Sequence, residues 1–328
     1  MTANASSLRF RPDGSFTIVQ LTDVHWHNGE PEDLRSRRLI ERILDAERPD
    51  LVALTGDIVG GYDSRDPADA YRQVVAPIEA RAIPWASVFG NHDDEGNLSR
   101  LDLLAVKQSC AWCLTERGPE DVTGVGNYVL RVRSREDDSL AAALYWLDSG
   151  SYNSHGVGDY AWIAWDQIAW YRAASRTLGA EYAASANRGP AGGRPRLPAL
   201  VFFHIPLPEF DEVWEQYPCR GFRYEPVCGP TLNSGFFAAV IEAGDVLGAF
   251  VGHDHVNDFE GELHGIRLCY GRASGHSPYG RDGFQRGARV IRLREGERSF
   301  ETWLRLDDGS IVSDPPAHEP RGHALNEE

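Results

Sequence analysis

Residues 16–25 read FTIVQLTDVH: an apolar run stops, and the metal-type ligands Asp23 and His25 follow at once. Short apolar runs rich in Val, Ile, Leu and Phe are typical of buried strands. In open α/β sheets, ligands gather beyond the carboxyl ends of the strands, so we expect such polar residues to meet at one site. Four further segments end in the same way: LVALTGD (51–57), WASVFGNHD (85–93), LVFFH (200–204) and LGAFVGHDH (247–255).

Segments with helical periodicity separate the first strands. They cover residues 33–47, 67–82 and 97–109, with an interruption or bend expected at Pro77 and an N-cap at Asn97. Strands that alternate with helices are typical of a parallel sheet with crossover helices. We therefore predict a βαβαβ core in the first half of the chain.

The middle of the chain has a different pattern. Residues 127–135 and 140–150 read as two strands joined by a polar turn, and residues 159–179 read as an aromatic-rich helix. The strand pair suggests a second sheet. The predicted fold is α/β, with a two-sheet β-sandwich flanked by helices in a single domain.

The domain is expected to span residues 16–306, after an N-terminal segment at residues 1–15. Residues 186–198 are rich in Gly, Pro and Arg, which indicates a mobile loop. Residues 307–328 are polar and contain several prolines, so we expect a frayed tail.

Composition narrows the class of partner. The chain has 328 residues and a formal net charge of -16, which argues against a general nucleic-acid or anionic-membrane surface. Its first residues lack the apolar core of a signal peptide, and no run approaches the roughly 18 apolar residues of a membrane helix. We expect a cytoplasmic protein without a membrane partner.

Five cysteines make an odd number, which does not suggest a disulfide framework. Cys110 and Cys113 form a C-x-x-C pair in a helix-like stretch, where a redox pair or half of a zinc site competes with ordinary packing. We favour packing, because no second C-x-x-C follows. Cys219 and Cys228 bracket a loop, and a structural role is favoured there too.

The residues after the strands form a coherent donor set. In an extended segment, Asp23 and His25 point the same way, and the same spacing recurs at His253 and His255. The Asp57 carboxylate has two oxygens and can bridge two ions. Oxygen and nitrogen donors without a thiolate suit Mn, Fe, Zn or Co. The full set is Asp23, His25, Asp57, Asn91, His204, His253 and His255.

Charge then indicates the substrate. Two divalent ions against the carboxylates of Asp23 and Asp57 leave a positive surplus, which attracts an anion such as a phosphate ester. Metal pairs about 3.5–4 Å apart activate a water and clamp the attacking and leaving oxygens. His92 follows Asn91 but lies off its face, so it is placed to contact the reacting group.

The ordered motifs D-x-H, GD, GNHD, a single histidine after a strand and GHxH resemble those of the calcineurin-like metallophosphoesterase superfamily. The resemblance implies a catalytic domain that hydrolyses phosphate esters with a metal-bound hydroxide and a catalytic His92. It implies two metal ions, one held by Asp23, His25, Asp57 and His255 and the other by Asp57, Asn91, His204 and His253.

A closer similarity is to the Dcr2-like and purple-acid-phosphatase-29-like branch. True purple acid phosphatases lack the histidine of D-x-H and carry a tyrosine three positions after the bridging aspartate. This chain has His25, and Gly60 at the other position, so we expect no purple colour. The similarity rests on GNHDDEG (90–96), YWLDSG (145–150), HIPLPEF (204–210), NSGFF (233–237), GHDHVNDF (252–259) and YGRASG (270–275).

Three more residues are candidates for binding the substrate or for orienting the residues that do. Asp93, with its acidic neighbours, would orient His92 or be a solvated loop acid. Arg272 would hold a phosphate oxygen or pair with a local acid, and His276 is a weaker candidate of the same kind.

Hydrolysis of small phosphate esters is the leading hypothesis, and a phosphoprotein substrate stays open. One alternative is a dedicated phosphodiesterase acting on nucleotides, cyclic nucleotides or organophosphate diesters, because the same metal pair serves both reactions. Another is a catalytically silent scaffold that binds protein. Lost metal ligands would be the mark of such a scaffold, and the motifs are complete.

Overall fold

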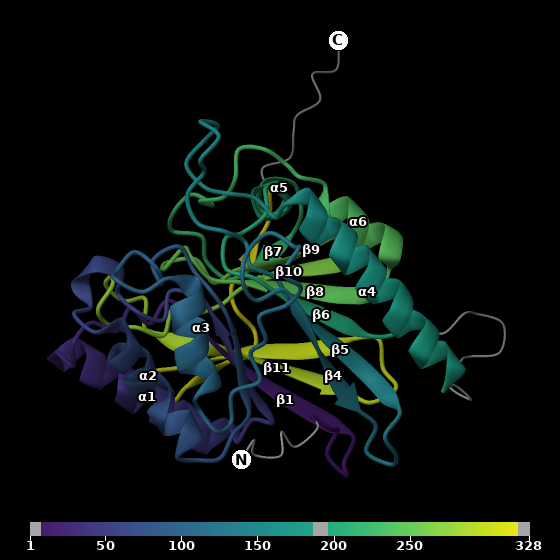
Figure 1. Ribbon diagram of the computed structural model, residues 1–328, viewed down its shortest axis with the longest axis horizontal. Coiled ribbons are helices and arrows are strands. Elements are labelled where there is room, and N and C mark those ends of the chain that lie inside the picture. The colour runs from purple at the N-terminus through teal and green to yellow at the C-terminus, as the bar shows by residue number, and fades with distance from the viewer. Residues whose placement is uncertain (1–7, 186–195, 321–328) are drawn as a thin grey trace.

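The computed structural model describes residues 8–185 and 196–320, which form two sheets packed between two layers of helices (Figure 1). Helices α1, α2 and α3 lie on one side of the sheets, and α4 and α6 lie on the other (Figure 1). The first sheet has the order β13 (Ile311–Val312), β12 (Phe300–Leu306), β11 (Gly287–Arg294), β1 (Ser15–Leu21), β2 (Leu51–Thr55) and β3 (Trp85–Val88).

The second sheet is larger and also mixes parallel with antiparallel pairs. Strands β5, β6, β8 and β10 are parallel neighbours, and the other pairs are antiparallel. Its order is β14 (Ala317–His318), β7 (Cys219–Arg220), β9 (Glu260–Leu263), β10 (Ile266–Tyr270), β8 (Val246–Val251), β6 (Ala199–Phe202), β5 (Leu140–Trp146) and β4 (Tyr128–Arg133).

The helices cover the outer faces of both sheets. Helix α1 has a proline in its first turn. Arg48, the residue that caps its carboxyl end, has a left-handed conformation. The helices are α1 (Pro31–Glu47), α2 (Pro67–Glu79), α3 (Arg100–Gln108), α4 (Trp165–Ala184), α5 (Glu209–Gln216) and α6 (Phe236–Ala243), and η1 (Gly61–Asp63) is a short 3-10 turn.

Strand β5 shows how the layers are held together. Its residues Leu144 and Trp146 pack between the sheets, whereas Ala143 and Tyr145 pack in the cluster under α4 and α6. Because successive side chains point to opposite faces and both faces are covered, the strand is apolar throughout. The predicted α/β fold with two sheets and flanking helices in one domain is confirmed.

Parallel strands bring the polar segments to one edge. β1, β2 and β3 are mutually parallel neighbours in the first sheet, and β6 and β8 are parallel neighbours in the second. Their carboxyl ends, at Leu21, Thr55, Val88, Phe202 and Val251, directly precede the five polar segments identified in the sequence.

Helices α2, α3 and α4 differ from the prediction. Helix α3 is capped by Ser99, not Asn97, because the Ser99 hydroxyl and the Asp102 carboxylate form a capping box. Helix α4 begins at Trp165, six residues later than expected. Helix α2 continues through Pro77, and the Gln73 carbonyl that this proline cannot reach accepts from Arg37 Nη2 at 3.2 Å.

The expected terminal segments are partly built into the fold. Leu8 and Phe10 are buried in the core between the sheets, so this part of the N-terminal segment packs with the domain. The expectation of a frayed tail is wrong for residues 307–320, because β13 pairs with β12 and β14 pairs with β7. Of the expected mobile loop, residues 186–195 lie outside the described residues, and Leu197 is buried.

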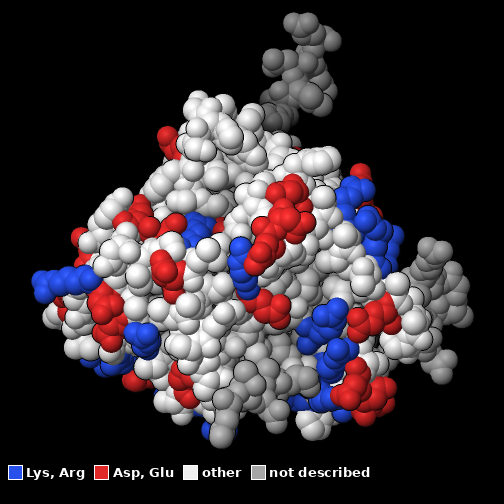
Figure 2. Space-filling view, viewed as in Figure 1, with Lys and Arg blue, Asp and Glu red and all other residues white. Residues whose placement is uncertain are grey.

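All five cysteines are free, and Cys110 and Cys113 follow helix α3 rather than lie within it. On the face shown in Figure 2, basic side chains lie among acidic ones rather than in a continuous basic patch. Within residues 8–185 and 196–320, no helix combines the length and apolar character needed to cross a bilayer.

Candidate metal centre

The first group of predicted ligands lies at the ends of β1, β2 and β8. One donor atom from each of Asp23, His25, Asp57 and His255 lies within 4.8 Å of the others, and all four residues are buried. His25 Nε2 lies 3.6 Å from Asp57 Oδ2, and His255 Nε2 lies 3.6 Å from Asp23 Oδ1. Four mixed oxygen and nitrogen donors at this spacing match the ligand shell of one divalent ion.

The second group shares Asp57 with the first. Donor atoms of Asp57, His204 and His253 also lie within 4.8 Å of one another. His204 Nε2 lies 3.1 Å from Asp57 Oδ2 and 3.2 Å from Asn91 Oδ1. Its Nδ1 donates to the Thr55 carbonyl at 2.8 Å, which leaves Nε2 as the nitrogen with a lone pair for a metal.

Unsatisfied polar atoms mark the same place. Buried polar groups are normally hydrogen-bonded, because an unpaired one costs about 1–3 kcal/mol. In the described part of the chain, five buried atoms of the two groups have no hydrogen-bond partner. They are His25 Nε2, Asp57 Oδ2, both ring nitrogens of His253 and His255 Nδ1. A pair of cations fits this donor set, because the carboxylate oxygen and one nitrogen of each neutral imidazole can donate a lone pair.

The electrostatics favour the neutral form of three of the four histidines. Burial lowers the pKa of His25 to about 4 and that of His253 to about 3, and it lowers the pKa of His255 well below its usual value. Burial also opposes protonation of His204, but the Asp57 carboxylate outweighs it and raises the pKa to about 9. Neutral imidazole is the form that binds a metal.

The backbone is strained where the ligands emerge. Asp23, His25, Asp57 and His253 all have positive φ, at 53°, 46°, 51° and 79°. The extended spacing expected for the D-x-H and H-x-H pairs is therefore wrong, although each pair reaches the site. The residue before Asn91 must be glycine, because a Cβ at Gly90 would lie 2.1 Å from Asp57 Oδ1.

His92 lies beside the two groups without belonging to either. Its ring centroid is 5.2 Å from that of His25, its backbone N–H donates to Asp57 Oδ1 at 2.8 Å, and its side chain is 37% exposed. Nδ1 lies 2.6 Å from Glu95 Oε2. Burial alone would lower the pKa of His92, but the charges of Asp57 and Glu95 raise it above the usual value.

Three tyrosines around the ligands escaped the sequence reasoning as site residues. The Tyr160 ring lies 4.5 Å from that of His253, and the Tyr279 ring lies 4.2 Å from that of His255. Tyr152 stacks on Tyr160 at 5.9 Å. Tyr279 lies in the same stretch as Arg272 and His276, outside any of the motifs. The aromatic-rich composition after residue 150 was the only signal for the other two.

The Asp93 carboxylate supports the loops rather than His92. It accepts hydrogen bonds from the backbone N–H groups of Asp57, Ile58, Val59 and Gly90, at 2.8 to 3.1 Å. The β2 and β3 loops are thereby tied together. The role of orienting His92 falls to Glu95, which the sequence offered only as one of several loop acids.

Arg272 and His276 do not face the ligand groups. Arg272 is buried and ion-paired with Asp258, its Nε donates to the Gln285 carbonyl, and its guanidinium lies 3.2 Å from the centre of the Phe284 ring. His276 Nε2 lies 3.3 Å from Asp307 Oδ2. Both side chains lie against local acids, which favours the local-pairing alternative over phosphate binding.

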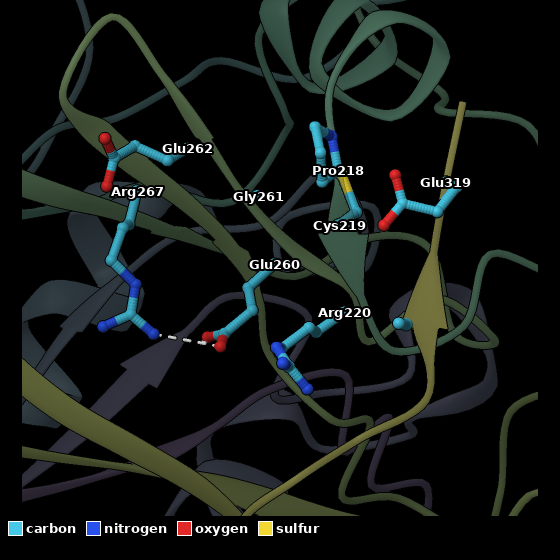
Figure 3. A pocket seen from close by; sticks show the side chains of 9 residues that line it. Pro218, Cys219, Arg220, Glu260, Gly261, Glu262, Arg267 and Glu319 are labelled. Atoms are coloured by element: carbon cyan, nitrogen blue, oxygen red, sulfur yellow. Dashed lines mark hydrogen bonds and ion pairs between the residues drawn. The ribbon is translucent and has the colours of Figure 1, made fainter. Parts of the chain in front are cut away.

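A separate cavity of about 320 Å³ lies at the edge of the second sheet (Figure 3). Two of its charged residues are paired, because Glu260 accepts from Arg267 at 2.9 Å, and Glu260 also accepts from Arg289, which lies outside the lining, at 3.0 Å. Burial raises the pKa of the Cys219 thiol, which also lines this cavity, to about 12. None of the lining residues is a predicted metal ligand.

Comparisons with known proteins agree with this geometry. The family model for calcineurin-like phosphoesterases matches residues 16–257. A protein named probable inactive purple acid phosphatase 29, from Arabidopsis thaliana, is 37% identical over 94% of this chain and 86% of its own. Phosphatase DCR2 of Saccharomyces cerevisiae is 32% identical over 92% of this chain and 56% of its own. Among solved structures, a dimetal phosphatase from Danio rerio shares the fold, with a TM-score of 0.57 and 16% identity over 88% of this chain and 98% of that one. The chain belongs to the calcineurin-like phosphoesterase family.

Proposed function

We propose that the chain hydrolyses phosphate esters with two divalent metal ions. One observation carries the proposal: two groups of buried donors share Asp57, and several of their atoms have no other partner. One ion would be held by Asp23, His25, Asp57 and His255, and the other by Asp57, Asn91, His204 and His253. When bound, such a pair lowers the pKa of water and neutralises charge on the phosphoryl group.

The protein residues set the charge of the pocket. Asp23 and Asp57 contribute two negative charges at most, and the neutral histidines contribute none, so two divalent ions leave a net positive site. Phosphate oxygens are the natural anions for it. The acidity of the whole chain does not oppose this, because the local field decides what binds.

His92 would act on the reacting ester. It is partly exposed, so a substrate can reach it, and the charges of Asp57 and Glu95 raise its pKa above the usual value. Glu95 holds Nδ1, which leaves Nε2 to donate a proton to the leaving oxygen or to stabilise charge in the transition state.

The words "probable inactive" in the names of three plant relatives concern those proteins. In this chain all seven predicted ligands and His92 are present, which supports hydrolysis over a silent scaffold. Gly60 also supports a centre without tyrosinate, because a Cβ there would lie 2.2 Å from His27 Cδ2.

The test compares the purified protein with Asp57→Asn and a matched control, Asp63→Asn. Asp63 lies in the same loop, but its carboxylate is 78% exposed and outside both donor groups. Metal content is measured by elemental analysis, and turnover is measured on an aryl monoester and a bis-aryl diester with Mn, Fe, Zn or Co supplied.

We expect the wild type and Asp63→Asn to bind two ions per chain and to hydrolyse ester. Asp57→Asn should lose both the metal ions and the hydrolysis. The ratio of the two rates distinguishes a phosphatase from a phosphodiesterase. Full turnover in Asp57→Asn would refute the proposal, and hydrolysis of neither ester by the wild type would favour the scaffold.

A further inference from the structure

We propose that Tyr152 is a positioning residue whose single hydroxyl orients both the Asn91 amide and the Glu95 carboxylate that holds His92. The inference rests on the proposed metal centre and deepens it. It concerns a residue outside every motif that identifies the family.

The hydroxyl of Tyr152 lies between two side chains of the site. It donates to Glu95 Oε1 at 2.8 Å, and Asn91 Nδ2 donates to it at 3.3 Å. The other oxygen of the same carboxylate, Oε2, lies 2.6 Å from His92 Nδ1. Each oxygen of Glu95 thus has its own partner, which fixes the rotation of the carboxylate.

The direction of these hydrogen bonds is forced. A carboxylate only accepts hydrogen bonds, so the one proton of the Tyr152 hydroxyl must go to Glu95. The hydroxyl oxygen can then only accept, and Asn91 must present its N–H group to it. The amide carbonyl is thereby turned the other way, where Oδ1 lies 3.2 Å from His204 Nε2.

This orientation decides whether Asn91 can bind a metal. The carbonyl oxygen carries the lone pair that a cation needs, whereas the amide nitrogen would present hydrogens to it. Ser151 adds a second hold, because its Oγ donates to the Asn91 backbone carbonyl at 3.2 Å. Residues 151 and 152 therefore restrain both the main chain and the side chain of Asn91.

Tyr160 provides a matched control. It stacks on Tyr152 and contacts His253 through its ring, but none of the described residues hydrogen-bonds to its hydroxyl. Tyr160→Phe and Tyr152→Phe remove the same atom from neighbouring rings. Only the second removes a hydroxyl that orients Asn91 and Glu95, and thermal melting verifies that both variants fold.

The first measurement is metal binding without substrate. Zn²⁺ is titrated into the metal-free protein against a chelator of known affinity. Loss of a group that orients a ligand typically costs 10–100-fold in affinity. We expect one of the two dissociation constants to rise by about tenfold or more in Tyr152→Phe, and both to stay near wild type in Tyr160→Phe. Equal affinities in wild type and Tyr152→Phe would overturn the proposal.

The second measurement is turnover of a bis-aryl diester at saturating metal. We expect kcat to fall in Tyr152→Phe with KM near wild type, and we expect the same substitution to cost little more once Glu95→Gln is present. Residues that act through one another are not additive in such a cycle. Fully additive losses would contradict the shared-carboxylate arrangement.

The two proposals fail in different ways. If the wild type binds two ions but hydrolyses no ester, the proposed function fails, while the Zn²⁺ titration still decides the role of Tyr152. If the wild type binds fewer than two ions, both proposals are wrong.

Discussion

His92 Nδ1 lies 2.6 Å from Oε2 of Glu95, three residues later in the same loop. Because Glu95 occupies Nδ1, the imidazole has one nitrogen, Nε2, left for chemistry. In the described residues, no side chain or backbone group hydrogen-bonds to Nε2. The buried histidines differ, because their rings pack edge to face in two pairs, His25 with His255 and His204 with His253.

Replacing His92 by alanine is expected to slow turnover without releasing metal. General acid catalysis by a positioned side chain contributes about 10²- to 10⁴-fold, so kcat should fall within that range. Elemental analysis should still find wild-type metal content. His27→Ala is the control, because His27 lies nearby and faces Asp63 rather than the donor groups. Loss of an ion from His92→Ala would make His92 a ligand instead.

The metal-free protein is expected to lose stability as the pH falls from about 6.5 to about 4. Burial lowers the pKa values of His25, His253 and His255, so in this window the unfolded state binds protons that the folded state does not. The slope of the unfolding free energy with pH is then positive. Asp23 and Asp254 oppose this trend, because burial raises their pKa values to about 7 and about 6.

Chelator-treated protein is therefore melted at several pH values between 4 and 7. We expect the melting temperature to rise with pH up to about 6.5, the usual pKa of histidine. Added Zn²⁺ should raise the melting temperature further near pH 7, because the ion binds only the folded state. A melting temperature that is highest near pH 4 would show that the buried histidines are protonated in the folded protein.

Arg272 is expected to matter for stability and not for substrate binding. Arg272→Met leaves Asp258 buried without its partner, and breaking such a pair costs about 3–5 kcal/mol. Arg281→Met is the control, because Arg281 is exposed and its guanidinium lies 4.2 Å from the centre of the Tyr224 ring. Urea unfolding measures the first effect. A raised KM with unchanged stability would restore Arg272 as a phosphate-binding residue.

The sequence predicted the metal centre because its signal is local. Each ligand follows a buried strand, and parallel strands bring their ends together, so Asp57 and His204 meet although 147 positions separate them. The prediction of extended spacing failed at Asp23 and His25. The chain there is left-handed, since it must turn sharply from the end of β1 into the site.

Residues whose roles depend on distant partners were beyond sequence reasoning. Whether Arg272 binds substrate depends on Asp258 and on the packing of Phe284, which no motif records. Tyr152 is linked to Glu95 by a contact across 57 positions. Such contacts depend on how the loops beyond the strands fold, and loops lack the periodicity that identifies strands and helices.

Lys107, the only lysine of the chain, allows a final test of the fold beneath the site. Its side chain is fully buried, and Nζ lies 3.3 Å from the centre of the Phe89 ring. Burial lowers its pKa to about 8, so much of the amine is neutral in mildly alkaline buffer. Reactivity then depends on exposure rather than on protonation.

An amine-reactive reagent should leave Lys107 unlabelled in the native protein and label it fully in urea, as peptide mass mapping would show. The native rate should follow the fraction of opened molecules. Free metal at about 100 times its dissociation constant favours the folded state by about 2.7 kcal/mol, which should slow labelling about 100-fold if opening releases the ion. Equal labelling with and without metal would mean that Lys107 is exposed by an opening that leaves the metal centre intact.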